Sequence, residues 1–215
     1  CFDTETTSLN ELEAELIGMS FSYKKGLAYY IPLSENREEV LETLEIFRPL
    51  FEKEEILKVA HNLKFDFKIL KRYGIEVQGA IFDTMIAHYL LNPDGRHGMD
   101  YLSEIYLNYK PVSIETLIGK GKNQVTLREV SIEEQTNYAA EDADITWQLY
   151  ELFAPQIQKE NLQDLFYKVE MPLMKVLAKM ELEGVSLDKN WLAQESKDLE
   201  NDLRELEKNI FELSG

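Results

Sequence analysis

The sequence of 215 residues has little cysteine and no long apolar run, and each shortage excludes a class of protein. Its one cysteine, Cys1, cannot form an internal disulfide, so a disulfide framework is excluded and a reducing compartment is favoured. No segment approaches the roughly 18 consecutive apolar residues of a membrane helix, and no basic stretch followed by an apolar one opens the chain. We therefore predict a cytoplasmic protein with no membrane partner.

Positive charge is also scarce. There are 40 Asp and Glu residues against 23 Lys and Arg, which gives a formal net charge of −17. Nucleic acids and anionic membranes usually bind basic surfaces, so this balance argues at first sight against both partners. The 44% hydrophobic, 29% charged and 11% aromatic residues are ordinary for a globular protein. The chain is therefore expected to fold as one sizeable domain, or as one domain and part of another.

The hydrophobic pattern predicts strands first and helices later. Two β-rich runs, 14–23 and 27–33, flank the hairpin signal Lys24-Lys25-Gly26, and residues 1–5 resemble a truncated strand before them. Strand and helix patterns then alternate, with a helix at 37–51, a strand at 56–60, a helix at 64–73, an apolar stretch at 80–82, and helices at 84–91 and 99–107. This order predicts an α/β domain with a mixed sheet covered by helices.

The second half of the chain is predicted to be mainly helical. Residues 108–130 break both periods, so we expect a loop with one helical turn there. Ser131 and Glu134 form a capping box for a helix at 132–153, which Pro155 would end or kink. Two long helical patterns follow, at 162–183 and at 189–213 after the cap residue Asp188. The last has an apolar stripe that needs a partner surface, formed by Leu199, Leu203, Leu206 and Ile210.

Acidic pairs are frequent enough that only their setting can distinguish a site, because chance alone gives roughly seven pairs two residues apart in this composition. Asp3 and Glu5 follow an apolar residue in a predicted central strand, so both project from the same face. Two such carboxylates repel each other unless a cation neutralises them, and Mg²⁺ or Mn²⁺ suits these hard oxygen ligands. A strand end with solvated acids is the alternative.

Two further acidic positions have unusual settings. Asp66 follows an apolar strand at a strand-to-helix junction, where α/β sheets place ligands, although an acid favoured by the helix dipole would look the same. Tyr138 and Asp142 are four residues apart and share one helical face, with small alanines beside them. That face could contact a substrate, or it could simply pack with a half-buried tyrosine.

Together these motifs resemble those of the DEDD exonuclease superfamily, tyrosine subclass. More closely, the chain resembles the proofreading 3′-5′ exonuclease domain of bacterial DNA polymerase I, in FDTETTSL (2–9), HNLKFD (61–66), FDTM (82–85), GRHGMDYLSE (95–104), GKGKNQ (119–124) and YAAEDADIT (138–146). Residues 170–188 resemble the start of the polymerase region. The resemblance implies an RNase H-like fold, with residues 1–160 as an exonuclease domain truncated at its N-terminus and 161–215 as the incomplete helical start of a polymerase domain. Because the chain begins with Cys1, we expect a fragment.

The resemblance also assigns roles. Asp3, Glu5 and Asp142 would hold one of two divalent ions, Mg²⁺ or Mn²⁺, Asp66 would support the second through water, and Tyr138 would orient the attacking water. The products would be nucleoside monophosphates. Substrate contacts are expected at Thr6, Leu9, His61, Asn62, Phe65, Arg96, Lys120 and Lys122. Two positions depart from the pattern, since Ile114 stands where a Phe is expected and His61 replaces a Gln. Base stacking by that Phe would be lost, so affinity for the terminal nucleotide is expected to be weaker.

The implied partners are the single-stranded 3′ end of DNA and a downstream polymerase domain of the same chain, in a monomer in the bacterial cytoplasm. Two alternatives are an RNase D-like RNA exonuclease, which shares the four acids and the tyrosine, and a non-catalytic exonuclease fold that serves as a scaffold. The net charge does not exclude DNA, because part of it is the metal site itself. Residues 110–128 carry four basic residues against the single acid Glu115. We expect weak, metal-dependent DNA binding by this chain alone.

Overall fold

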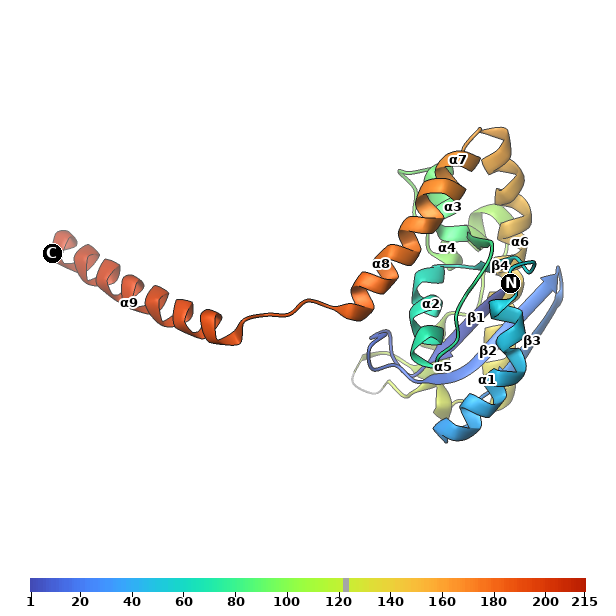
Figure 1. Ribbon diagram of the computed structural model, residues 1–215, viewed down its shortest axis with the longest axis horizontal. Helices are drawn as coiled ribbons and strands as arrows, with labels where there is room; N and C mark the ends of the chain where they lie inside the picture. Colours follow the sequence, from blue (N-terminus) through green and yellow to red (C-terminus); the bar gives the residue numbers. More distant parts are fainter. Residues whose placement is uncertain (122–123) are drawn as a thin grey trace. The chain divides into compact units, whose positions relative to one another are not determined.

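The computed structural model describes residues 1–121 and 124–215 and separates them into two compact units, 1–182 and 183–215. The first unit contains the strands and most of the helices (Figure 1). Among the described residues, no helix combines the length and the apolar character that a membrane crossing requires.

The strands form two small sheets. An antiparallel sheet has the order β1 (Phe2–Thr6), β2 (Leu16–Lys24) and β3 (Leu27–Pro32), and a parallel pair is formed by β4 (Lys58–Ala60) and β5 (Ile81–Asp83). The predicted hairpin is confirmed between β2 and β3, where Gly26 adopts a φ of 74° that glycine allows without strain. Residues of β4 lie in contact with β1, so antiparallel and parallel strands meet beside the start of the chain.

Helices cover this arrangement on both sides. In Figure 1, α1 lies in front of the antiparallel sheet and α6 lies behind it. The helices and helical turns of the first unit are α1 (Arg37–Glu52), α2 (Leu63–Arg72), α3 (Thr84–Leu91), α4 (Met99–Leu102) with a π turn at Ser103–Leu107, α5 (Ile114–Ile118), a 3₁₀ turn at Leu127–Glu129, α6 (Ile132–Lys159), α7 (Gln163–Leu165), a π turn at Phe166–Glu170, and α8 (Met171–Glu183).

The core is continuous from β1 to α8. Phe2 on β1 meets Phe51 on α1 edge to face, with ring centroids 5.1 Å apart, and Phe82 on β5 packs against Phe166 at 4.7 Å. Each fully buried aromatic or aliphatic side chain of this kind contributes about 1.5–3 kcal/mol to folding. Met174 on α8 is buried in the same core. One continuous hydrophobic core therefore holds β1, α1, β5 and α8 in place.

Helix α6 differs from the sequence prediction at its end. Its start is confirmed, because the Ser131 hydroxyl accepts from the Glu134 N–H at 3.3 Å. Ending at Pro155 was one of the two predicted outcomes and is wrong, since the helix continues to Lys159. The buried side chains of Phe153 and Ile157 lie four residues apart on one face, and their burial offsets the hydrogen bond that the proline cannot make.

Helix α8 is tied to α2 by a buried cation. Lys68 on α2 is 4% exposed, and its Nζ lies 2.6 Å from Glu181 on α8 and 2.7 Å from Glu11 in the loop between β1 and β2. One ammonium group therefore connects three separate segments. The predicted domain border at residue 160 stays a prediction.

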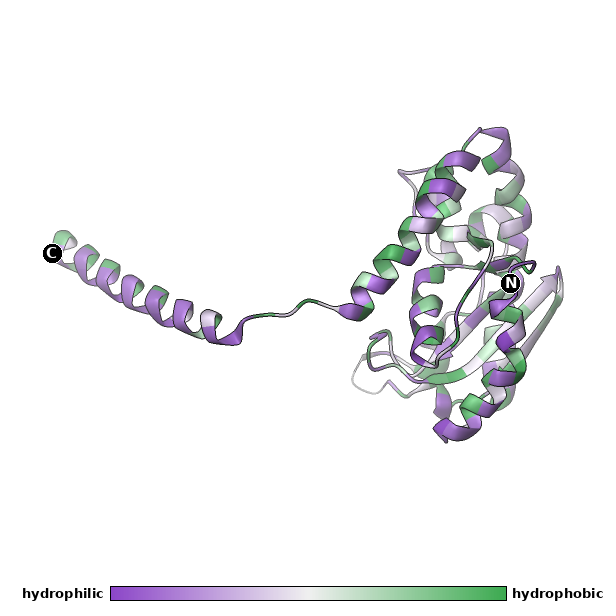
Figure 2. Cartoon of the chain, viewed as in Figure 1, coloured by the Kyte–Doolittle hydropathy of each residue, from purple (hydrophilic) through white to green (hydrophobic). Residues whose placement is uncertain are grey.

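The second unit contains α9 (Lys189–Ser214), which matches the predicted helix. The predicted cap is confirmed, because the Asp188 side chain accepts from the N–H groups of Asn190 and Trp191 at 3.0 and 2.9 Å. Apolar residues recur about once per turn along α9 (Figure 2), and the four predicted stripe residues are all exposed.

Candidate active site

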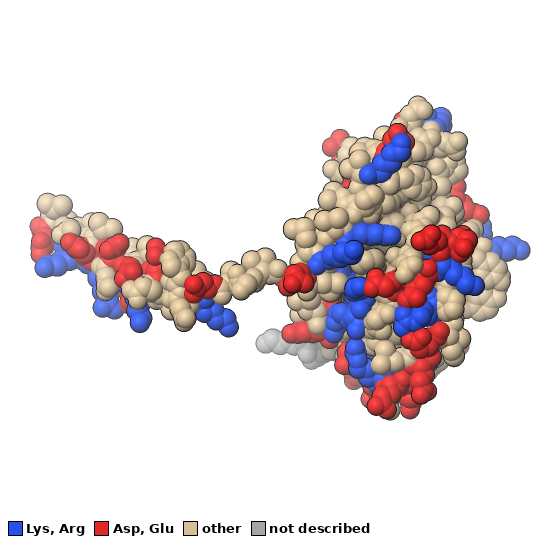
Figure 3. Space-filling model, viewed as in Figure 1, with Lys and Arg blue, Asp and Glu red and all other residues tan. Residues whose placement is uncertain are grey.

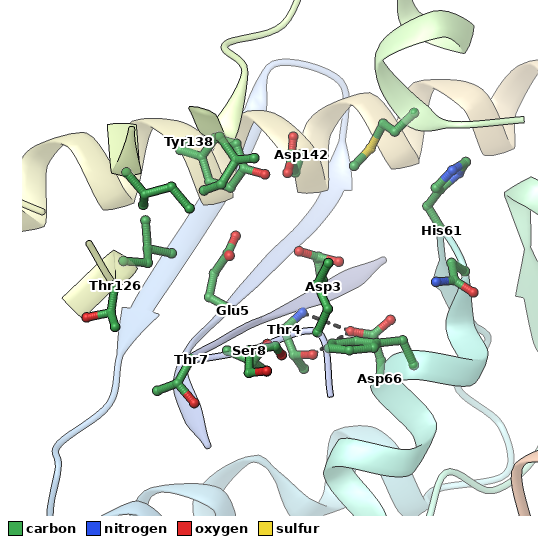
Figure 4. Close-up of a pocket in the computed structure, with 18 of the residues that line it drawn as sticks. Asp3, Thr4, Glu5, Thr7, Ser8, His61, Asp66, Thr126, Tyr138 and Asp142 are labelled. Atoms are coloured by element: carbon green, nitrogen blue, oxygen red, sulfur yellow. Dashed lines mark hydrogen bonds between the residues drawn. The ribbon is translucent and has the colours of Figure 1, made fainter. Parts of the chain in front are cut away.

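A cavity of about 750 Å³ opens between β1, the start of α2 and α6, and acidic side chains from all three elements line it. Figure 4 shows Asp3 and Glu5 rising from β1 toward α6, which carries Asp142 and Tyr138. One carboxylate oxygen from each of Asp3, Glu5 and Asp142 lies within 4.8 Å of the others. The structure therefore brings together residues that lie up to 139 positions apart in the sequence.

Side chains alternate between the two faces of strand β1, and this alternation explains which way the acids of the cluster point. Asp3 and Glu5 project toward the cavity, whereas Thr4 between them projects toward α2. Both the backbone N–H and the hydroxyl of Thr4 donate to Asp66 Oδ1, at 3.0 and 2.6 Å. Asp66 is only 1% exposed, so it is a buried acid fastened to β1 rather than a solvated residue at a helix start.

The carboxylates of the cluster are held in surroundings that oppose their negative charge. Burial raises the pKa of Asp3 from 3.8 to about 7. Burial, followed by the charges of neighbouring acids, raises the pKa values of Glu5 and Asp142 well above their ordinary range, and burial together with the Asp3 charge does the same for Asp66. No Lys or Arg of residues 1–121 and 124–215 is among the causes of these shifts, so this part of the chain supplies no compensating positive charge to the cluster.

One oxygen atom of the cluster lacks a partner in the described part of the chain. Glu5 Oε1 is buried and has no hydrogen-bond partner among the described residues. A buried acceptor in this state is costly, so such atoms usually have a partner in the working protein, either a water or an ion. Together with the all-carboxylate donor set, this fits a hard divalent cation.

Tyr138 lies beside these acids with its hydroxyl in the neutral form. Burial, and then the negative charges of Asp142 and Glu5, raise the pKa of Tyr138 above its ordinary value near 10. The phenol therefore keeps its proton at neutral pH and can donate as well as accept a hydrogen bond. This suits a residue that orients a bound water rather than one that removes a proton.

The predicted substrate contacts divide into three groups. Thr6, Leu9, His61, Asn62 and Phe65 all line the cavity, and Leu9 is 89% exposed at its rim. Arg96 and Lys120 are exposed and are not among the residues that line it, and Lys120 is paired with Glu115 at 2.5 Å. Lys122 lies outside the described residues.

An apolar wall of the cavity was missed by the sequence analysis. It is contributed by the segment between α4 and α6 and consists of Ile114, Ile118, Val125 and Leu127, with Met99 beside it. Only Ile114 had been singled out, because the segment shows no regular period. The spacing of Ile114 and Ile118 by four residues was the one available signal of a helical turn with a common face.

The α/β fold, together with a buried acidic cluster and a neutral tyrosine beside it, places the chain in the RNase H-like class of exonuclease folds. A sequence profile described as "3'-5' exonuclease" matches residues 1–158. The chain belongs to this 3′-5′ exonuclease family, in the form that occurs within DNA polymerase I.

Curated relatives extend over the whole chain. It is 38% identical to the DNA polymerase I of Rhizobium leguminosarum, with 100% of this chain and 23% of the relative covered. The DNA polymerase I of Borreliella burgdorferi is also 38% identical, with 99% and 23% covered. The chain thus spans about a quarter of the length of these relatives.

Solved structures share the fold. The POL domain of Pol1 from M. smegmatis, in complex with DNA primer-template and dNTP, has a TM-score of 0.75 at 18% identity and covers 95% of this chain and 32% of its own. Brucella melitensis NrnC with bound Mg²⁺ has a TM-score of 0.68 at 21% identity and covers 85% and 84%.

Proposed function

We propose that this chain removes nucleotides one at a time from the 3′ end of single-stranded DNA, as the proofreading part of a longer, monomeric DNA polymerase I. The observation that carries the proposal is the cavity in which Asp3, Glu5, Asp142 and Tyr138 meet, where Glu5 Oε1 is buried and has no hydrogen-bond partner among the described residues. Carboxylates that bind metal and a tyrosine that keeps its proton are poor nucleophiles, which favours attack by water.

The acids are proposed to act as metal ligands. Asp3, Glu5 and Asp142 would hold one Mg²⁺ or Mn²⁺, and Asp66 would support a second through water. When bound, such a pair of ions lowers the pKa of the attacking water and neutralises the charge that develops on the phosphate. Tyr138, with its proton retained, would hydrogen-bond that water and orient it toward the phosphorus.

Other residues that line the cavity are proposed to bind the 3′ end of the DNA strand. Leu9 and Phe65 provide apolar surfaces for a terminal base, and Asn62 offers both donors and an acceptor. Ile114 supplies aliphatic contact where an aromatic ring would stack on the base, so the grip on the terminal nucleotide is expected to be looser.

The surface charge supports only modest affinity for DNA outside this cavity. On the face shown in Figure 3, Lys and Arg side chains are interleaved with Asp and Glu rather than gathered into a basic track. Because phosphate contacts dominate nucleic-acid affinity, the chain alone should bind weakly and need metal to do so. A polymerase domain would supply most of the affinity.

The test is digestion of a 5′-labelled single-stranded DNA with Mg²⁺ or Mn²⁺. The protein should shorten it from the 3′ end, and EDTA should stop the reaction. Asp142→Ala should lower the rate at least about 100-fold, because loss of a group that only supports a metal ligand already lowers activity by up to about 100-fold. Asp144→Ala is the matched control, since Asp144 lies on the same helix but outside the cavity. Full activity of Asp142→Ala, or in EDTA, would refute the proposal.

The two alternatives predict other outcomes of the same assay. A strong preference for an RNA of the same sequence would favour an RNase D-like exonuclease. A protein that neither digests DNA nor binds Mn²⁺ at the acids at millimolar concentration would be a scaffold with the exonuclease fold.

A further inference from the structure

The FDTM string at the end of β5 has no role in the proposed chemistry, yet Asp83 within it makes an unusual set of hydrogen bonds. Asp83 is 1% exposed. Its Oδ1 accepts from the N–H groups of Met85 and Ile86 at 2.8 and 3.2 Å, which caps α3. The same carboxylate accepts from the N–H of Leu63, the first residue of α2, at 2.8 Å and from that of Asn62, the residue before it, at 3.3 Å. One carboxylate therefore caps two helices.

The second of these caps bears directly on the cavity. Asn62 precedes α2 in a left-handed conformation, with φ 60° and ψ 46°, and its own side chain makes no capping bond. This conformation is unfavourable for residues other than glycine, although Asn tolerates it better than most. Because the Asn62 side chain is free of capping and lines the cavity, its direction depends on the backbone bonds that Asp83 accepts.

The residue after Asp83, Thr84 at the start of α3, acts on the neighbour of Asn62. The Thr84 hydroxyl donates to the Ala60 carbonyl at 3.3 Å, and the same oxygen lies 2.9 Å from His61 Nδ1. With its hydrogen engaged at Ala60, the oxygen accepts from an Nδ1–H of His61. Burial lowers the pKa of His61 to about 4, so its ring is neutral at pH 7. Thr84 thus fixes the ring orientation of a second residue that lines the cavity.

We propose that Asp83 and Thr84 are positioning residues that hold Asn62 and His61 in place against the 3′-terminal nucleotide. Neither lines the cavity itself, so both act through the side chains that do. The inference rests on the proposed function, because it assigns those side chains a substrate. Burial raises the pKa of Asp83 to about 6, so the carboxylate is ionised at neutral pH and accepts from all four N–H groups.

A double-mutant cycle tests the inference on the intact chain. Asp83→Ala is expected to raise the KM for a short single-stranded DNA about tenfold, with kcat changed less than twofold. The hydrogen bonds that Asp83 accepts from the described residues come from Asn62, Leu63, Met85 and Ile86 and from none of the four acids. In an Asn62→Ala background the same substitution should change KM less than twofold, because the residue through which Asp83 acts has gone. Equal effects in both backgrounds would overturn the inference.

A variant that removes a helix cap elsewhere in the chain is the control for loss of stability. Asn36→Ala removes the side chain that caps α1 by accepting from Glu38 at 2.9 Å, and it should leave KM unchanged. Should Asp83→Ala not fold, Asp83→Asn keeps Oδ1 and replaces only the oxygen that faces Leu63, and a smaller rise in KM is expected. Thr84→Val should also raise KM and Thr84→Ser should restore it, whereas equal KM values for the two would refute the role of Thr84.

The unsubstituted protein shows whether the proposed function itself fails, separately from the positioning role of Asp83. If it does not hydrolyse DNA with Mn²⁺, the proposed function fails, and hydrogen exchange then tests the positioning by itself. The amides of Asn62 and Leu63 should exchange at least tenfold faster in Asp83→Ala than in Asn36→Ala. Equal exchange rates in the two variants would overturn the inference without reference to any substrate.

Discussion

Replacing one acid of the cluster is expected to make the metal-free protein more stable while it abolishes the proposed activity. Asp3→Asn keeps the size and shape of the side chain and removes one of the three charges that converge in the cavity. The pKa of Asp3 is raised from 3.8 to about 7 by burial, so the folded protein resists ionising this group. The substitution removes that resistance.

The size of the effect follows from the linkage between protonation and folding. A group whose pKa is raised in the folded state stabilises the fold fully below its unfolded pKa, which is near 4 for Asp3. That stabilisation is lost as the pH rises through about 7. The difference between about 7 and 3.8 corresponds to about 4 kcal/mol at pH 8, which is an upper limit for the gain in the variant. For a domain of this size, that upper limit corresponds to a rise in Tm of about 8–16 °C.

The assay is thermal unfolding, followed by circular dichroism, at pH 5 and pH 8 in EDTA and in Mn²⁺. In EDTA the variant should unfold at a higher temperature than the natural sequence at pH 8, and the difference should shrink at pH 5. Mn²⁺ should stabilise the natural sequence, by about 2.7 kcal/mol at 100 times its Kd, and the variant much less. A variant that is less stable than the natural sequence in EDTA at pH 8 would refute the reasoning.

Two further predictions concern packing. Glu11→Ala and Glu181→Ala are each expected to lower the free energy of unfolding by about 1 kcal/mol, but the double variant should lose about 3–5 kcal/mol, because it leaves the buried Lys68 ammonium without either partner. Urea denaturation measures this, and strictly additive losses would contradict it. A Cβ at Gly18 would overlap the Tyr30 ring, so Gly18→Ala should lower the free energy of unfolding by about 1–3 kcal/mol in the same experiment, and an unchanged midpoint would show that the ring moves aside.

Much of the fold followed from periodicity and from residues with strong local preferences. The hairpin turn at Gly26 and the caps at Ser131 and Asp188 were predicted because each depends on a few neighbouring residues. Pro155 misled the prediction of the α6 end, since burial of Ile157 comes from packing on distant elements that no local pattern records. The π turns after α4 and before α8 likewise have no separate local signal, because their residues read as ordinary helix.

The acids were easier to predict than the walls around them. Asp3 and Glu5 stand out because charge is unexpected on a buried strand, and Tyr138 and Asp142 share a helical face by spacing alone. Asp83 has no sequence signal of its own beyond the FDTM string, since a capping carboxylate at a strand end resembles any other polar strand terminus. Its function as a double cap depends on two helix starts that are 21 residues apart, which only the folded chain brings together.

The bond between Asp66 and Thr4 bears on how an inactive form of this protein should be made. A protein engineer who wants a folded but silent nuclease has four acids from which to choose, and they are not equivalent. Asp66 Oδ1 takes up both polar hydrogens of Thr4 and so fastens α2 to β1, and truncating it would leave those donors buried without an acceptor. Asp142 makes no such hydrogen bond with the strand. It is therefore the better position at which to silence the site and keep the scaffold.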